Sequence, residues 1–72
     1  MYKVNNIDRS DWKEYKYMVI RDCVDDLEEY YNGDEKFRYW YWGSYDDLGV
    51  AHNEASELCN GLLVETENVV KL

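Results

Sequence analysis

An uninterrupted run of large side chains at residues 37–42 limits the folds that this chain can adopt. The run reads Phe37-Arg38-Tyr39-Trp40-Tyr41-Trp42. Its composition predicts a strand over Lys36–Trp42 whose side chains alternate between two sides. One side would carry Phe37, Tyr39 and Tyr41, and the other would carry Arg38, Trp40 and Trp42. Because both sides are large and aromatic, the strand must either be covered on both faces or use one face as a binding surface.

The chain is short, but its composition favours an ordered fold. Its 72 residues are 46% hydrophobic and include eight Tyr, three Trp and one Phe. Aromatic side chains bury large areas, so a core can form without metal or disulfide staples. We therefore expect one domain over residues 1–72. We expect the two cysteines, Cys23 and Cys59, to be reduced core residues of a cytoplasmic protein, with a disulfide in an oxidising compartment as the alternative.

Capping residues and apolar spacing predict two helices. Ser10 is a suitable N-cap for a helix over residues 11–32, and Gly33 is a suitable residue to end it. The apolar face of this helix would comprise Trp12, Tyr15, Val19, Cys23, Leu27 and Tyr30, at spacings of three and four residues. Ser44 is the expected cap of a second helix, which Gly61 would end.

Alternating residues predict strands before and after these helices. Met1–Val4 is expected to form a short first strand, and Leu62–Leu72 a strand or a hairpin broken near Thr66–Asn68. The element order is then β-α-β-α-β. The predicted fold class is α+β: a small two-layer domain with two helices packed on one face of a sheet of about three strands. The opposite face of the sheet would be open unless a partner or a second copy of the chain covers it.

Charge is distributed unevenly along this chain, whose net charge is −8. Residues 1–21 and residues 36–45 each carry a net charge of +2, whereas residues 46–72 carry −5. Residues 22–35 carry −7, from Asp22, Asp25, Asp26, Glu28, Glu29, Asp34 and Glu35. An acidic block of this kind indicates a basic partner.

Within the predicted first helix, most of these acids would project away from the apolar face. Like-charged neighbours three or four residues apart disfavour a helix by a few tenths of a kcal/mol. Lys13 and Lys16 would lie towards the positive N-terminus, and Glu28 and Glu29 towards the negative C-terminus, an order that the helix dipole disfavours. Because locally unfavourable choices are typical of functional sites, we predict that the acids bind a partner. The alternative is an ordinary solvated face of an amphipathic helix.

Other classes of function fit the residues less well. Direct nucleic-acid binding is disfavoured, because it depends on Lys and Arg neutralising phosphates. His52 has no motif that supplies a nucleophile or an orienting acid, so we expect no enzyme. His52 and Cys59 alone do not make a zinc site, and neither an EF-hand loop nor a Glu-x-x-His motif is present, so we expect no metal and no cofactor. No segment approaches the roughly 20 apolar residues that span a bilayer, so we expect no membrane partner.

The chain resembles, in size, acidity and lack of catalytic motifs, the small phage and mobile-element proteins that block host nucleic-acid enzymes. These include anti-restriction, anti-CRISPR and glycosylase-inhibitor proteins. The resemblance is compositional and covers no alignable motif. It implies a non-enzymatic inhibitor that presents its carboxylates to a basic, nucleic-acid-binding protein. The alternative is a protein-interaction module, for example a homodimer, that uses an aromatic sheet face with Trp40 and Trp42.

Overall fold

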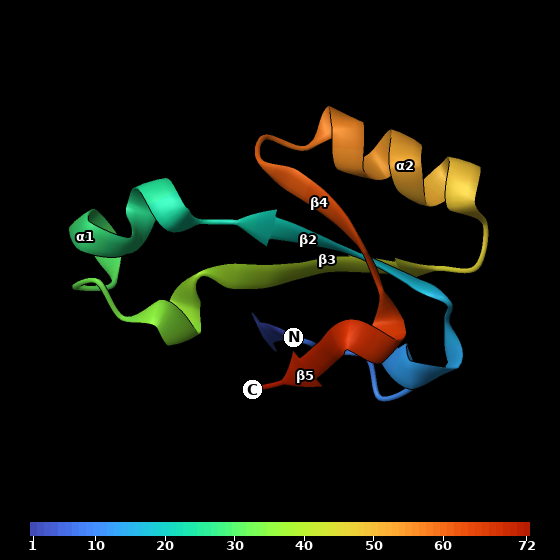
Figure 1. Ribbon diagram of the computed structural model, residues 1–72, viewed down its shortest axis with the longest axis horizontal. Helices are drawn as coiled ribbons and strands as arrows, with labels where there is room; N and C mark the ends of the chain where they lie inside the picture. Colours follow the sequence, from blue (N-terminus) through green and yellow to red (C-terminus); the bar gives the residue numbers. More distant parts are fainter.

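The computed structural model describes residues 1–72 and shows a five-stranded sheet with two helices (Figure 1). The strands are β1 (Tyr2–Asn5), β2 (Tyr17–Asp22), β3 (Tyr39–Tyr45), β4 (Gly61–Glu65) and β5 (Val69–Lys71). The helices are α1 (Leu27–Tyr30), which is a single turn, and α2 (Leu48–Glu57). Turns of 3-10 helix cover Trp12–Glu14, Val24–Asp26, Glu35–Phe37 and Thr66–Asn68. The α+β class is confirmed, whereas the three-stranded sheet and the order β-α-β-α-β are wrong.

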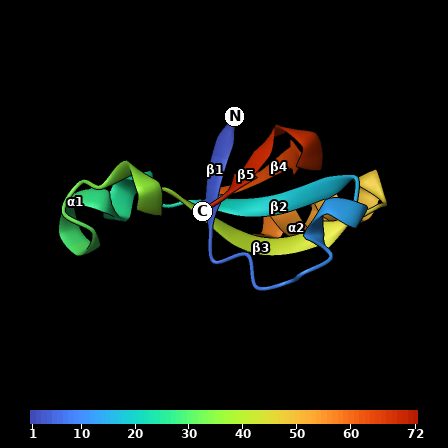
Figure 2. The same cartoon turned by 90° about the horizontal axis from the view of Figure 1, so that it is seen from below.

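The sheet curls strongly, so that its two edges approach each other. The strand order is β4-β2-β3-β1-β5, with β2 antiparallel to β3 and β4, and β1 parallel to β3 and β5. In a flat sheet the edge strands β4 and β5 would lie about 19 Å apart, at roughly 4.8 Å per strand. The segment between them, Thr66–Asn68, is one 3-10 turn that rises only about 6 Å. Figures 1 and 2 show β4 running directly into this turn and on to β5.

The curled sheet encloses the larger of two apolar clusters. Met18 and Ile20 of β2 are fully buried inside it. The rest of this cluster comprises Val4, Ile7, Trp12, Val64 and Val69. Strand alternation places Val19 on the other face of β2, where it packs with Ala51 and Ala55 of α2. The strand β2 is therefore central and buried on both faces.

The predicted helix over residues 11–32 is wrong. The chain instead forms the turn Trp12–Glu14, then β2, and then a helical segment made of the turn Val24–Asp26 and α1. The run Tyr-Met-Val-Ile at residues 17–20 contains β-branched residues and no polar alternation, as is typical of a strand buried on both faces. The helix-like spacing arose because apolar residues on both faces of β2 were combined with those of the flanking turns.

The second helix is present as α2, and it is the helix that packs on the sheet, against β2, β3 and β4. Its N-cap is Asp47, whose Oδ1 accepts a hydrogen bond from the Val50 N–H at 3.1 Å. The expected cap, Ser44, lies buried in β3 and shares a hydrogen bond of 2.8 Å with the Tyr41 hydroxyl. The helix ends before Gly61, which begins β4. Neither helix has the length and apolar character needed to cross a membrane.

Candidate functional site

Residues 23–38 form a lobe at one end of the molecule, called the acidic lobe below. The neighbouring strands β2 and β3 are antiparallel, and their ends meet at the pair Asp22 and Tyr39. The chain between these two residues does not make a tight hairpin loop but folds into two 3-10 turns and α1. Figures 1 and 2 show the lobe projecting beyond the end of the sheet. The expectation that this first helix packs on the sheet beside the second is therefore wrong.

Ion pairs and hydrogen bonds hold the lobe where it joins the sheet. The carboxylate of Asp22 accepts hydrogen bonds from Nε and Nη2 of Arg38 at 3.2 and 3.3 Å. These hydrogen bonds, together with the negative charge, raise the pKa of Arg38 above its ordinary value. The Cys23 N–H donates to the Arg38 carbonyl at 2.7 Å, and Nη2 of Arg21 lies 3.5 Å from Oδ2 of Asp26. The two chain segments at the base of the lobe are thus joined, which restrains its position.

The acidic lobe has a small apolar interior of its own. Leu27 is buried, and the ring of Tyr31 stacks on that of Phe37 with centroids 4.8 Å apart. Trp40 of β3 lies 6.5 Å from the Phe37 ring, and its Nε1–H donates to the Phe37 carbonyl at 2.8 Å. Gly33 has a φ of 75°, so it reverses the chain after α1 in a conformation that glycine adopts without steric cost. The lobe is therefore packed rather than an extended loop.

The two cysteines allow a chemical check of the base of the lobe. Both are free thiols, but only Cys23 is a core residue, at 5% exposed, whereas Cys59 is exposed. Burial raises the pKa of the Cys23 thiol. Because the thiolate is the reactive form, we expect one thiol per chain to react rapidly with an aromatic disulfide reagent at about pH 8, and the second only on unfolding. Cys59→Ser should remove the rapid phase and Cys23→Ser should not; rapid reaction of both thiols in the folded protein would contradict the burial of Cys23.

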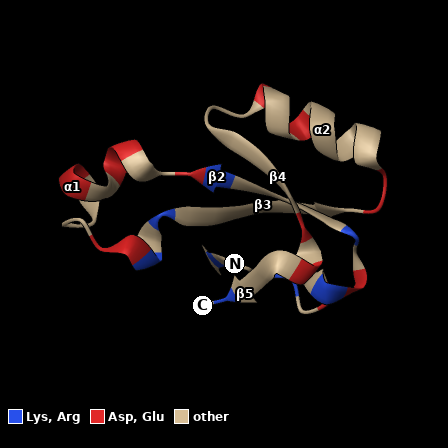
Figure 3. Cartoon of the chain, in the orientation of Figure 1, with Lys and Arg blue, Asp and Glu red and all other residues tan.

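The structure places six of the seven predicted acids in the acidic lobe and the seventh, Asp22, at its base (Figure 3). Three of the seven have partners within the chain, in the pairs Asp22–Arg38, Asp26–Arg21 and Asp34–Lys36. The other four are exposed and take part in none of the ion pairs of the chain: Asp25, Glu28, Glu29 and Glu35. These four carboxylates are therefore exposed charges without a partner of opposite sign in the chain.

The acids do not form one long row along a single helix. Asp25 and Asp26 lie in the first turn of the 3-10 segment, and Glu28 and Glu29 lie in the first turn of α1. In the helical segment over residues 24–30, Asp25 and Asp26 lie near the positive end, where negative charge is favoured, whereas Glu28 and Glu29 lie near the other end. Asp11, at the start of the predicted helix, pairs with Arg9 elsewhere in the chain at 2.9 Å. The exposure and projection of the acids are thus the observations that favour a functional role.

The two tryptophans of the expected aromatic face lie in different surroundings. Trp40 is half-buried against Phe37 at the base of the lobe. Trp42 is 55% exposed. It occupies a β-bulge, because its neighbours Tyr41 and Gly43 pair with consecutive residues of β2 and leave Trp42 unpaired. Bulges of this kind often re-aim a side chain next to a functional surface.

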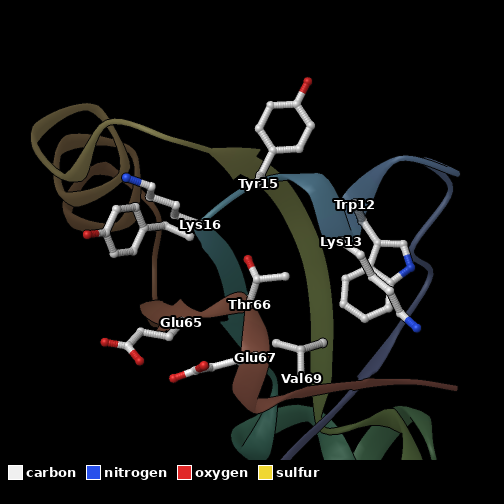
Figure 4. Close-up of a pocket in the computed structure, with 9 residues that line it drawn as sticks. Trp12, Lys13, Tyr15, Lys16, Glu65, Thr66, Glu67 and Val69 are labelled. Atoms are coloured by element: carbon white, nitrogen blue, oxygen red, sulfur yellow. The ribbon is translucent and has the colours of Figure 1, made fainter.

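A groove at the other end of β2 was not foreseen from the sequence. It has a volume of about 620 Å³ and is formed by the turns Trp12–Glu14 and Thr66–Asn68 with the adjoining strand ends (Figure 4). Its lining includes aromatic and apolar residues, two lysines and two glutamates. The two turns are more than fifty residues apart in sequence. They meet because β2 and β4 are antiparallel neighbours whose ends pair at Tyr17 and Glu65, and no local pattern of residues reveals that pairing.

The chain shows no preformed metal centre: no group of three or more His, Cys, Asp or Glu side chains is placed to hold an ion. His52 is exposed on α2. Comparisons with protein-family models, with curated proteins and with solved structures found no match. A function for this chain has therefore to be inferred from its own geometry and charge.

Proposed function

We propose that this protein is a non-enzymatic inhibitor or regulator that binds a basic, nucleic-acid-handling protein through the acidic lobe. Its carboxylates would occupy the positions that phosphates take in a basic cleft of the partner. One observation carries the proposal: a lobe that projects beyond the sheet bears Asp25, Glu28, Glu29 and Glu35, all exposed and without ion-pair partners.

Two properties of the lobe suit it to a concave basic partner. First, the helical segment over residues 24–30 sets Asp25 about 5–6 Å from Glu28 and Glu29, so negative charge is dense, as it is along a nucleic-acid backbone. Second, the Asp22–Arg38 pair and the stacked aromatic rings hold the lobe in one arrangement. A preorganised lobe loses less conformational entropy on binding than a disordered acidic tail would.

Reversing two of the unpaired charges should weaken partner capture by at least about tenfold, which corresponds to about 1.4 kcal/mol. In the variant Asp25→Lys/Glu29→Lys, two attractive charges become repulsive towards a basic surface. The measurement is a pull-down from a host lysate at low and high salt, with identification by mass spectrometry, followed by competition with duplex DNA. Capture by the unchanged protein should fall steeply with salt, because exposed charges are screened, and DNA should compete.

The variant Glu14→Lys/Glu57→Lys is the matched control, because it makes the same change in net charge at two exposed residues outside the lobe. It should retain the partner if the lobe is the contact surface. Unchanged capture by the lobe variant, or capture that stays flat from low to high salt, would contradict the proposal. An equal loss in both variants would also count against the lobe, since only total charge would then matter.

A homodimer or another protein contact through Trp42 is the second candidate function. It is favoured by the 55% exposure of this side chain on a β-bulge. A homodimer predicts a mass in sedimentation above that of one chain. The higher mass should be lost in Trp42→Ala and retained in the lobe variant. Under the inhibitor proposal, Trp42→Ala should leave partner capture intact, and the lobe variant should weaken it.

A further inference from the structure

The groove beside Thr66 extends along the edge of β5. A second cavity of about 450 Å³ shares Trp12, Lys13 and Val69 with the first, so the two are parts of one channel, called the seam groove below. It lies between residues 12–17 and residues 65–71, along the edge strand β5. Sites of several hundred Å³ are typical of small ligands.

Thr66 supplies an unused hydrogen-bonding group at the centre of the seam groove. The residue is only 8% exposed, and its Oγ1 has no hydrogen-bond partner in the chain. Its backbone N–H is already bonded to the Lys16 carbonyl at 3.0 Å. Figure 4 shows Thr66 at the centre of the lining residues, where its Oγ1 is itself covered by neighbouring atoms. Because an unsatisfied buried hydroxyl is unfavourable, a ligand that bonds to it after a small shift of the neighbouring side chains gains affinity.

The charges along the seam groove have a definite polarity. Figure 4 shows the carboxylates of Glu65 and Glu67 together on one side and Lys13 on the opposite side. Lys71 lines the continuation of the groove beyond Lys13, whereas Lys16 directs its ammonium group away from the centre. None of these residues takes part in an ion pair. In a chain of net charge −8, such a balanced groove suits a ligand that is positive at one end and negative at the other.

The remaining surface of the seam groove suits an extended backbone with an apolar side chain. The strand β5 pairs only with β1, so its outer edge leaves main-chain donors and acceptors unpaired. An extended peptide adds to such an edge as a further strand. Trp12 and Val69, which line both parts of the groove, provide apolar surface in its middle.

We propose that the seam groove binds a short extended peptide with free ends and an apolar central side chain. Its amino end lies at Glu65 and Glu67, and its carboxylate lies at Lys13 and Lys71. The Thr66 hydroxyl bonds to the peptide backbone between them. Three extended residues span about 10 Å, so a tripeptide is the simplest probe. The site uses none of the residues of the acidic lobe and is independent of the proposed inhibition.

The probe is the tripeptide Ala-Leu-Ala with free ends, titrated into the full chain and followed by amide nitrogen–proton NMR. We expect saturable shifts centred on Thr66 and β5, with a dissociation constant in the millimolar range, about −4 kcal/mol. The same peptide with an acetylated amino end and an amidated carboxyl end should bind at least about tenfold more weakly, because it lacks both charges.

Three variants test the polarity of the groove. Lys71→Gln and Glu67→Gln should each weaken binding of the free peptide several-fold, but should have little effect on the capped peptide. Glu57→Gln, an exposed change on α2, is the matched control and should leave binding unchanged. The NMR spectrum of each variant shows directly whether it is folded. The proposal is overturned if no saturable shift occurs up to about 10 mM peptide, if capped and free peptides bind equally, or if the shifts lie outside the groove.

Discussion

Met18→Ala should lower the free energy of unfolding by about 3 kcal/mol, and the melting temperature by about 10–20 °C. The side chain is fully buried inside the curled sheet, where it lies in the same cluster as Ile20 and Val64. Truncation removes apolar contacts and leaves a cavity that the surrounding strands can fill only in part. A chain of this length has about 4–11 kcal/mol of stability, so the variant should lie near the limit of folding. Urea denaturation followed by circular dichroism measures the change.

The other methionine of the chain provides the control. Met1 is 86% exposed, so Met1→Ala should change the free energy of unfolding by less than about 0.5 kcal/mol. A similar small effect for Met18→Ala would mean that residues 17–22 do not form the central strand. In the rejected helix over residues 11–32, Met18 lay outside the predicted apolar face, and its truncation would have been nearly neutral.

Gly61→Ala should cost about 2–3 kcal/mol of stability, because the position has no room for a side chain. A Cβ atom there would collide with the carbonyl oxygen of Ala55 and lie 3.0 Å from the Cβ of Leu58. The first of these is a backbone atom of α2, so relief requires a shift of the helix relative to β4. The shift would also strain the hydrogen bond of 3.0 Å from the Gly61 N–H to the Leu58 carbonyl.

Gly49→Ala is the matched control, because it adds the same methyl group within α2. Its Cβ would lie 3.2 Å from Oδ1 of Asp47, the end of a side chain that can move. Since alanine favours helix by about 1 kcal/mol over glycine, this variant should be neutral or more stable. If the two variants had equal effects in urea denaturation, the close packing of α2 on the start of β4 would be refuted.

The parts of the fold that could be predicted from the sequence are those specified by local patterns. The second helix has regularly spaced alanines, and the strand residues around Trp40 have high β propensity, so both were recognised within a few residues. The strand β2 was missed because Met18, Val19 and Ile20 are buried on alternate faces, which erases the alternation that marks a half-exposed strand. The parallel pairing of β1 with β3 and β5 depends on contacts between distant residues, which no local pattern specifies.

The candidate site was likewise predictable from the sequence only in part. The acids from Asp22 to Glu35 are visible in the sequence as charge, but their arrangement depended on the secondary structure assigned to them. A helix over residues 11–32 would have spread them along one face. The hairpin of β2 and β3 gathers them in a lobe instead and uses Asp22 to bind Arg38. The seam groove could not be predicted, because Trp12 and Thr66 are brought together by the pairing of β2 with β4, which links residues distant in sequence.

The parallel pairing of β1 with β5 also determines when this chain can complete its fold during synthesis. Residues 2–5 find their outer partner in residues 69–71, nearly the full length of the chain away. Such distant pairing closes a large loop and slows folding relative to a protein built from hairpins. Until residues 69–71 have emerged from the ribosome, one edge of β1 and the apolar residues Val4 and Val69 lack their final contacts. The sheet is therefore expected to be completed only once residues 69–71 have emerged, and the seam groove forms at the same stage.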